Sequence, residues 1–203
     1  MHTSNHPARR STAAALVITA LFVLTQLYSA IPLIGPVSTD LGRNATFALS
    51  TSFSLCYALG FLIWGPIADH YGRRTCLLID MALLTVATLS CAVTTSLGAL
   101  AVARCIQGIT AASFAPIALA YLSDSTPPAW RGTAIGAMST AFLVAGIFGQ
   151  VTAQAITERW GWHWVFGASA LVLFICAGAI AVLMRDRTTR TPYSSLIDQF
   201  TRV

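Results

Sequence analysis

The sequence predicts an all-α membrane protein with six transmembrane helices. Hydrophobic residues make up 56% of the chain and charged residues 9%, with a mean hydropathy of +0.71, whereas charged residues form about a quarter of a typical soluble domain. The charges bound six apolar intervals, and each interval is about long enough to cross roughly 30 Å of hydrocarbon as a helix. Lipid is therefore the expected solvent for most of the chain.

The gaps between charges, together with helix-breaking residues, place the six helices. We expect them near residues 12–38, 47–69, 74–94, 98–122, 131–157 and 162–184. Pro32 and Pro36 break the end of the first helix, and Pro127 with Pro128 ends the fourth, because proline lacks an amide donor and fixes φ. Residues 1–11 then form a short tail, and residues 185–203 form a second tail or the start of a linker.

The arginines predict the orientation in the membrane. All twelve basic residues are arginine; nine lie in segments on one side of the predicted helices, two on the other, and Arg104 lies inside a helix. Because basic residues accumulate on the cytoplasmic side, we expect both termini in the cytoplasm of a multi-pass cell-membrane protein, the inner membrane in a bacterium. Tryptophans, which favour the membrane interface, gather at the predicted helix ends: Trp130, Trp160, Trp162 and Trp164.

Several function classes are disfavoured. The net charge of +5 comes from arginines at the ends of apolar runs, so we expect a lipid bilayer as partner and no nucleic acid. The five cysteines form no CxxC pair and have no histidine nearby, so neither a metal site nor a cofactor is expected. An intramembrane serine protease, with Ser169 as nucleophile, would need a histidine base inside the membrane. All four histidines lie in tails or at helix boundaries, so we expect no enzyme.

Two short segments resemble each other. Residues 68–74, between the second and third helices, and residues 157–163, between the fifth and sixth, both follow the order small, acidic, basic, aromatic, glycine. The two segments lie on opposite sides of the predicted membrane. The six helices therefore form a predicted 3+3 inverted repeat, a construction found in secondary transporters.

The segment at residues 65–74 carries a motif of spacing G-x-x-x-D-x-x-G-R-[KR]. Gly65 allows close helix approach and Gly72 a tight turn. The motif resembles the signature loop of the major facilitator superfamily, and an ordinary positive loop is the alternative. The resemblance implies a charge network with an acid at the end of the fourth helix. The implied cytoplasmic gate network comprises Gly65, Asp69, Gly72, Arg73, Arg74, Asp124 and Arg131.

A second resemblance lies in the fourth helix, where Arg104, Gln107 and Gly108 match the family's R-x-x-Q-G motif. An arginine within a span is costly unless paired or hydrated, and snorkelling to the outer surface is the alternative. Asp80, inside the third helix, is either a proton carrier or a partner of an arginine in the inner loop. The candidate solute or proton path comprises Gln26, Asp80, Arg104, Gln107, Gln150 and Gln154.

The fifth helix has small residues at every fourth position, which favours close helix packing. With Gly108 of the fourth helix, the predicted packing residues are Ala137, Ala141, Ala145, Gly149 and Ala153. The proton-coupled drug exporters of the family carry G-P-x-x-G-G in this helix. Residues 149–154 keep only the first glycine, which weakens that particular assignment.

The resemblance implies the N-terminal six-helix half of a major facilitator superfamily transporter. Such a protein moves a small-molecule substrate by alternating access, and proton-coupled efflux is one form of it. Its expected partners are the substrate, protons, and a second six-helix half or a dimer partner. A fragment of a longer chain, a truncated and non-transporting product, and a half-size protein that dimerises remain open alternatives.

Overall fold

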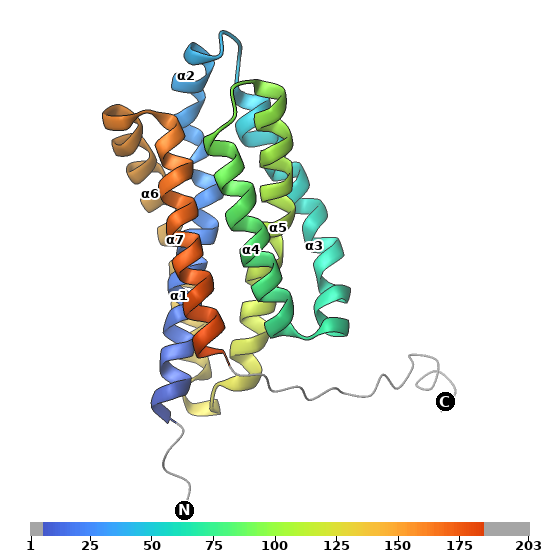
Figure 1. Cartoon of the computed structure of the whole chain (residues 1–203). Coiled ribbons are helices and arrows are strands. Elements are labelled where there is room, and N and C mark those ends of the chain that lie inside the picture. Colours follow the sequence, from blue (N-terminus) through green and yellow to red (C-terminus); the bar gives the residue numbers. More distant parts are fainter. Residues whose placement is uncertain (1–5, 185–203) are drawn as a thin grey trace, which may run out of the picture.

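The computed structural model describes residues 6–184, with the side chains of 6–9, 65–66 and 69–71 outside the described part. Six helices in it are long and apolar enough to cross a membrane, which confirms the predicted all-α architecture (Figure 1). The predicted tail at 185–203 lies outside the described residues. The elements are α1 (His6–Tyr28), α2 (Ala30–Asp40), the π-helical turn η1 (Phe47–Thr51), α3 (Ser52–Tyr71), α4 (Arg73–Ala92), α5 (Leu97–Ser125), α6 (Pro128–Trp160) and α7 (Trp162–Leu183).

Prolines explain two differences from the expected helix bounds. The first predicted helix is divided into α1 and α2 at Ser29. Pro32 is the third residue of α2, where a helix needs no amide donor for its own hydrogen bonds. The fifth span begins at Pro128 rather than at residue 131, because the fixed φ of proline suits the first position of a helix.

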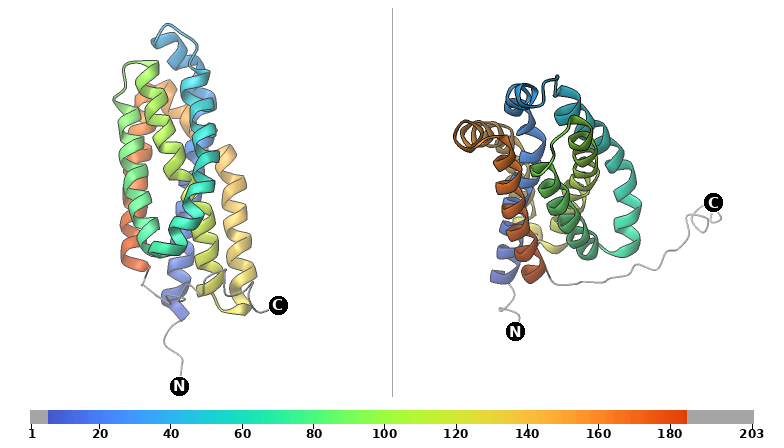
Figure 2. Two further views of the ribbon diagram at one scale, coloured as in Figure 1. Left: turned by 90° about the vertical axis from the view of Figure 1, so that its right-hand side faces the viewer. Right: turned by 45° about the horizontal axis from the view of Figure 1, so that its top comes forward.

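The helices run side by side along one axis and pack as an inverted repeat (Figures 1 and 2). Helix α3 packs on α5 as α6 packs on α1, and α4 packs on α5 as α7 packs on α1. Helices α4 and α7 also pack on each other. Exchanging α1, α3 and α4 for α5, α6 and α7 therefore reproduces the pattern of contacts, as a 3+3 repeat requires.

The two segments that resemble each other in sequence make the same turn. Gly72 joins α3 to α4 with φ 88° and ψ 138°, and Gly161 joins α6 to α7 with φ 91° and ψ 163°. A positive φ of this kind is open to glycine and strained for other residues. The two turns lie at opposite ends of the bundle (Figure 1). The end at which α1 begins and α7 finishes also holds the Gly72 turn, and we call it the terminal end.

Small residues bring the paired helices into close contact. A Cβ atom on Gly108 of α5 would overlap the carbonyl oxygen of Phe53 on α3, and one on Gly60 of α3 would lie 2.6 Å from Cβ of Ala112. In the matching α1–α6 contact, a Cβ on Gly149 would lie 3.1 Å from the carbonyl oxygen of Thr25.

The small-residue stripe of α6 is buried along most of its length. Ala141, Ala145, Gly149 and Ala153 are buried, but Ala137 is exposed. A spacing of four residues turns by about 40° at each step of a helix with 3.6 residues per turn. The stripe therefore rotates away from α1, and Ala137 is no packing residue within this bundle.

The tryptophans do not share one environment. Trp130, Trp160 and Trp164 are exposed, as interface anchors should be. Trp162 is buried instead, and its Nε1 donates a hydrogen bond to the Asp40 carboxylate at 3.0 Å. Two residues along a helix correspond to a turn of about 200°, so within α7 Trp162 faces the core while Trp164 faces outward; Trp160 belongs to α6, before the Gly161 turn. Trp162 holds the start of α7 against the end of α2.

The close contact at Gly108 between α3 and α5 predicts that a larger side chain at this position destabilises the protein. Gly108→Ala should lower the melting temperature by roughly 3–10 °C, because overpacking costs about 1–3 kcal/mol. Circular dichroism in detergent measures it. Gly178→Ala is the matched control, since a Cβ there meets nothing within 4 Å. Equal melting temperatures for the two variants would contradict the close packing.

Candidate functional site: a charged cluster at the terminal end and a buried polar network

Arg73, the first residue of α4, binds the last turn of α5. Its Nη1 pairs with the carboxylate of Asp124 and also donates a hydrogen bond to the carbonyl oxygen of Ala120 at 3.0 Å. A cation near the C-terminal end of a helix is favourable, because that end of the helix dipole carries partial negative charge. Arg73 therefore joins two helices through both an acid and a backbone group.

Arg74 makes the corresponding contact with the end of α7. Its Nε donates to the carbonyl oxygen of Met184 at 2.7 Å, and its Nη2 donates to that of Ala181 at 3.1 Å. Thr12 of α1 adds a hydrogen bond to the carbonyl oxygen of Leu183 at 3.0 Å. We call Arg73, Arg74, Asp124 and their carbonyl partners the terminal cluster. It holds the start of α4 against the ends of two other helices.

The predicted gate network is only partly assembled. The sequence placed Arg73 and Asp124 in one network, and the structure brings them together. Arg131 is exposed at the start of α6, and no ion pair joins it to Asp124 among the described side chains. The surroundings of Gly65 and the side chain of Asp69 lie outside the described part. The contacts of Arg74 with α7 were not predictable from sequence, because their acceptors are backbone carbonyls that any residue carries.

A second polar cluster surrounds Arg104 in the interior. Arg104 is fully buried, and its Nε donates to the carbonyl oxygen of Leu49 in η1 at 2.8 Å. Its Nη1 donates to the backbone carbonyl of Gln26 at 3.0 Å and to Oε1 of Gln107 at 2.6 Å. The guanidinium also lies 4.3 Å from the centre of the Phe53 ring, within range of a cation–π interaction.

Gln107 extends this cluster to α4. Its Nε2 donates to Oγ1 of Thr88 at 2.8 Å and to Oε1 of Gln26 at 3.2 Å. The side chains of Gln26, Thr88, Arg104 and Gln107, with the Leu49 carbonyl, form what we call the buried polar network. It joins α1, η1, α4 and α5, and π-helical turns such as η1 are frequent at functional sites.

The buried polar network differs from both sequence-based expectations for Arg104. The side chain does not snorkel, since none of it is exposed. Nor does it line an open path in this conformation, because Gln26 and Gln107 are 1% and 0% exposed. All its hydrogen-bond acceptors are neutral, and Nη2 has no hydrogen-bond partner among the described residues. The guanidinium is held by oriented dipoles rather than by a carboxylate.

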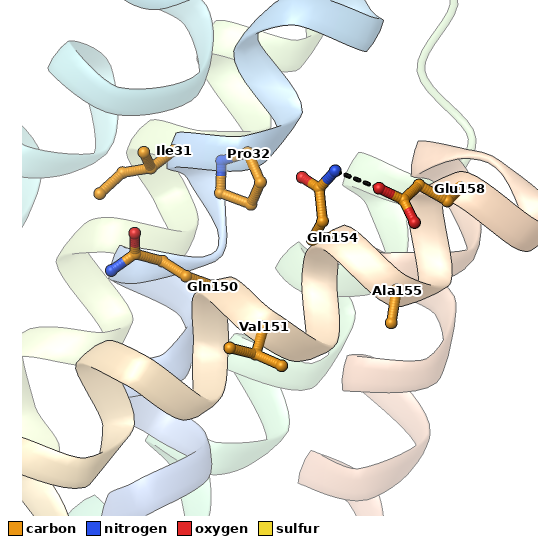
Figure 3. A pocket seen from close by; sticks show the side chains of 7 residues that line it. All are labelled: Ile31, Pro32, Gln150, Val151, Gln154, Ala155 and Glu158. Atoms are coloured by element: carbon orange, nitrogen blue, oxygen red, sulfur yellow. Dashed lines mark hydrogen bonds between the residues drawn. The ribbon is translucent and has the colours of Figure 1, made fainter.

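Two other candidate path residues lie in an open groove between α2 and α6. Gln150 and Gln154 line it, and Figure 3 shows them facing Ile31 and Pro32 across the groove. Its volume is about 460 Å³. Glu158, which accepts a hydrogen bond from Nε2 of Gln154, also lines it and was not singled out from the sequence. Its position four residues after Gln154 on one helix face was the available signal.

The remaining candidate, Asp80, lies inside the bundle on α4 and is 0% exposed. It contacts neither the terminal cluster nor the buried polar network through any hydrogen bond found among the described residues. Within that part of the chain, no group of three or more histidine, cysteine or acidic residues is arranged to hold a metal ion.

Comparison with known proteins agrees with this fold. Residues 16–201 match the family profile described as Major Facilitator Superfamily. Multidrug resistance protein 3 of Bacillus subtilis is 30% identical over 133 residues, which are 65% of this chain and 26% of that protein. Multidrug export protein EmrB of Haemophilus influenzae is 32% identical over 133 residues, 64% of this chain and 26% of that protein.

A solved structure is also similar. The bacterial homolog of the human lysosomal transporter Spinster, in an inward-facing and occupied conformation, superposes with a TM-score of 0.82 at 21% identity. The match covers 90% of this chain and 46% of that one. The family profile places the chain in a family of membrane transport proteins. The chain belongs to the major facilitator superfamily and spans about a quarter of the length of these two curated relatives.

The buried polar network predicts unequal costs for two substitutions. Arg104→Met leaves the acceptors on Leu49, Gln26 and Gln107 without their donor, and we expect a loss of roughly 2–5 kcal/mol in the free energy of unfolding. Thr88→Val removes one acceptor of Gln107 and should cost about 1 kcal/mol. Denaturation in mixed micelles measures both. A loss for Arg104→Met no larger than for Thr88→Val would contradict the central role of the guanidinium.

Proposed function

We propose that this chain is one six-helix half of a secondary transporter that moves a small solute across the cell membrane by alternating access. Family membership and the named multidrug relatives support the transport role. The observation that carries the mechanism is the terminal cluster. It places the signature-loop arginine against Asp124 at the end of the bundle where a gate would act.

The Arg73–Asp124 ion pair is weak enough to break and re-form during a transport cycle. The two side chains are 34% and 66% exposed, and exposed ion pairs contribute only about 0–1 kcal/mol. Such a pair biases the terminal end toward one arrangement without locking it. Alternating access requires states that differ by a few kcal/mol at most, so that each is populated during the cycle.

We infer that the terminal end faces the cytoplasm, because nine of the twelve arginines fall on that side of the predicted membrane. In a bacterium this would be the inner membrane. The arginine-rich loops then lie in the cytoplasm, the side on which basic residues accumulate. The groove lined by Gln150, Gln154 and Glu158 lies on α6 and α2, and its apolar walls with one acid fit a lipophilic cation better than an anion.

The first test of this proposal is transport itself. Proteoliposomes that contain the chain together with a six-helix second half should take up ethidium, a lipophilic cation, faster than empty liposomes. The observable is the rise in fluorescence when ethidium binds enclosed DNA. Glu158→Gln should slow uptake, whereas Arg43→Gln, at an exposed position outside the groove, should not. Absence of flux for ethidium and for a panel of neutral and anionic solutes would argue against a transporter.

The gate pair yields a second prediction. Arg73→Gln and Asp124→Asn should each change the transport rate by about 1.5–5-fold, the factor that corresponds to an exposed pair of 0.2–1 kcal/mol. In a double-mutant cycle the combined variant should fall short of the product of the two single effects, because both remove the same interaction. Strictly multiplicative effects would show that the two residues act independently. Arg43→Gln again serves as the control.

A further inference from the structure

Asp80 is a buried acid that the gate and the buried polar network leave unused. Neither carboxylate oxygen has a hydrogen-bond partner among the described residues, and the same holds for Oγ of Ser113 on the facing helix α5. The Ser113 hydroxyl lies near enough to interact with the Asp80 carboxyl, although the two form no hydrogen bond in this conformation. Three buried oxygens without hydrogen-bond partners among the described residues therefore lie on the two packed helices α4 and α5.

Among the described side chains, the surroundings of Asp80 offer no charge to balance a carboxylate. Its helix neighbours Leu77 and Leu84, on the same face of α4, are fully buried in the hydrophobic core. Cys76 is the titratable group beside it on α4. The only other charged side chain buried in the described part is Arg104, whose hydrogen bonds go to Leu49, Gln26 and Gln107.

The two arginines whose side chains are described at the start of α4 are also engaged. Arg73 binds Asp124 and the carbonyl of Ala120, and Arg74 binds carbonyls at the end of α7. Seven residues separate Arg73 from Asp80, which corresponds to about 10 Å along the helix. The sequence-based alternative, in which Asp80 pairs with an arginine of the inner loop, does not describe this conformation.

Binding of one proton neutralises the Asp80 carboxylate and so removes the cost of burying its charge. An isolated carboxylate in an apolar interior is so costly that the group neutralises instead. A neutral carboxyl has one donor and retains acceptors, and a serine hydroxyl has one donor and two acceptor lone pairs. The protonated acid and Ser113 can therefore satisfy each other after a small movement. A metal cation would need about six oxygen ligands, and this place offers three orphan oxygens.

We propose that Asp80 and Ser113 form a buried proton-binding site, in which Asp80 is held as the neutral acid while the terminal cluster is closed. The Arg73–Asp124 pair joins the same two helices, α4 and α5, near the terminal end. Opening of that pair lets water approach Asp80, and the proton then leaves to the aqueous phase at the terminal end. This inference rests on the proposed transport function for its role in coupling, but the protonation itself does not.

Infrared spectroscopy tests the protonation directly. At pH 7 the purified chain in lipid nanodiscs should show the C=O stretch of a protonated carboxylic acid, and Asp80→Asn should abolish it. Glu158→Gln removes an exposed carboxyl as the control and should leave the band unchanged. Ser113→Ala should move the band to higher frequency, because the acid loses its hydrogen-bond partner. A spectrum without this band at pH 7, or a band that persists in Asp80→Asn, would overturn the proposal.

Folding must be separated from proton binding. Asparagine is neutral and has the shape of the protonated acid, so Asp80→Asn should melt within about 2 °C of the unmodified chain at pH 7. Asp80→Ala leaves a void and an unpaired Ser113, and should melt lower than Asp80→Asn. If asparagine is as damaging as alanine at this position, the native residue is not the neutral acid.

The coupling role has its own readout. With the second half present, a proton gradient should accelerate ethidium transport by the unmodified chain. Asp80→Asn should retain downhill ethidium movement and lose that acceleration. An equal response to the gradient in both would overturn the coupling role. Absence of any flux in the unmodified chain would instead count against the proposed function, while the infrared result would still decide whether Asp80 binds a proton.

Discussion

A polar group within the membrane is costly unless it finds a partner inside the protein, and the buried cation Arg104 is the strongest case of that constraint in the described part of this chain. The guanidinium is buried without a carboxylate and is held by two backbone carbonyls and the amide oxygen of Gln107. Water is absent from the hydrocarbon region, so these acceptors cannot be exchanged at low cost. This one side chain joins α1, η1 and α5. Gln107 also donates a hydrogen bond to Thr88 and so connects Arg104 to α4.

The terminal cluster works under the opposite physical conditions. Arg73 and Asp124 remain partly exposed, so water competes for both groups and the pair is weak. One end of the bundle is thus joined by interactions that break readily, while the interior is joined by interactions that do not. Asp80 lies between the two regions, on the helix that begins with Arg73. Weak contacts at the terminal end and strong contacts in the interior suit a protein that opens at one end while its core stays packed.

Much of the fold was predictable because lipid restricts the possibilities so severely. A charge-free interval of sufficient length can only be a helix in a membrane, so six spans could be placed from the charges. The turns at Gly72 and Gly161 were also visible as a repeated pattern, because a positive φ selects glycine. The local bounds were harder to predict. The division of the first span at Ser29 and the start of α6 at Pro128 depend on where a proline falls within a helical turn. Trp162, likewise, faces Asp40 and the core rather than the interface.

The sequence by itself determined the number of spans and the family motif, because composition and spacing carry those features directly, and the resemblance to the family implied the pairing of Arg73 with Asp124. Only the tertiary structure decided that Arg74 binds the end of α7, that Arg104 is held by neutral acceptors, and that Asp80 and Ser113 are buried without hydrogen-bond partners among the described residues. The reason is physical. Backbone carbonyls are the same at every position, and whether a polar side chain faces lipid, a neighbour or a groove depends on the rotation of each helix. That rotation is set by close contacts such as the one at Gly108, which exist only once the helices have packed.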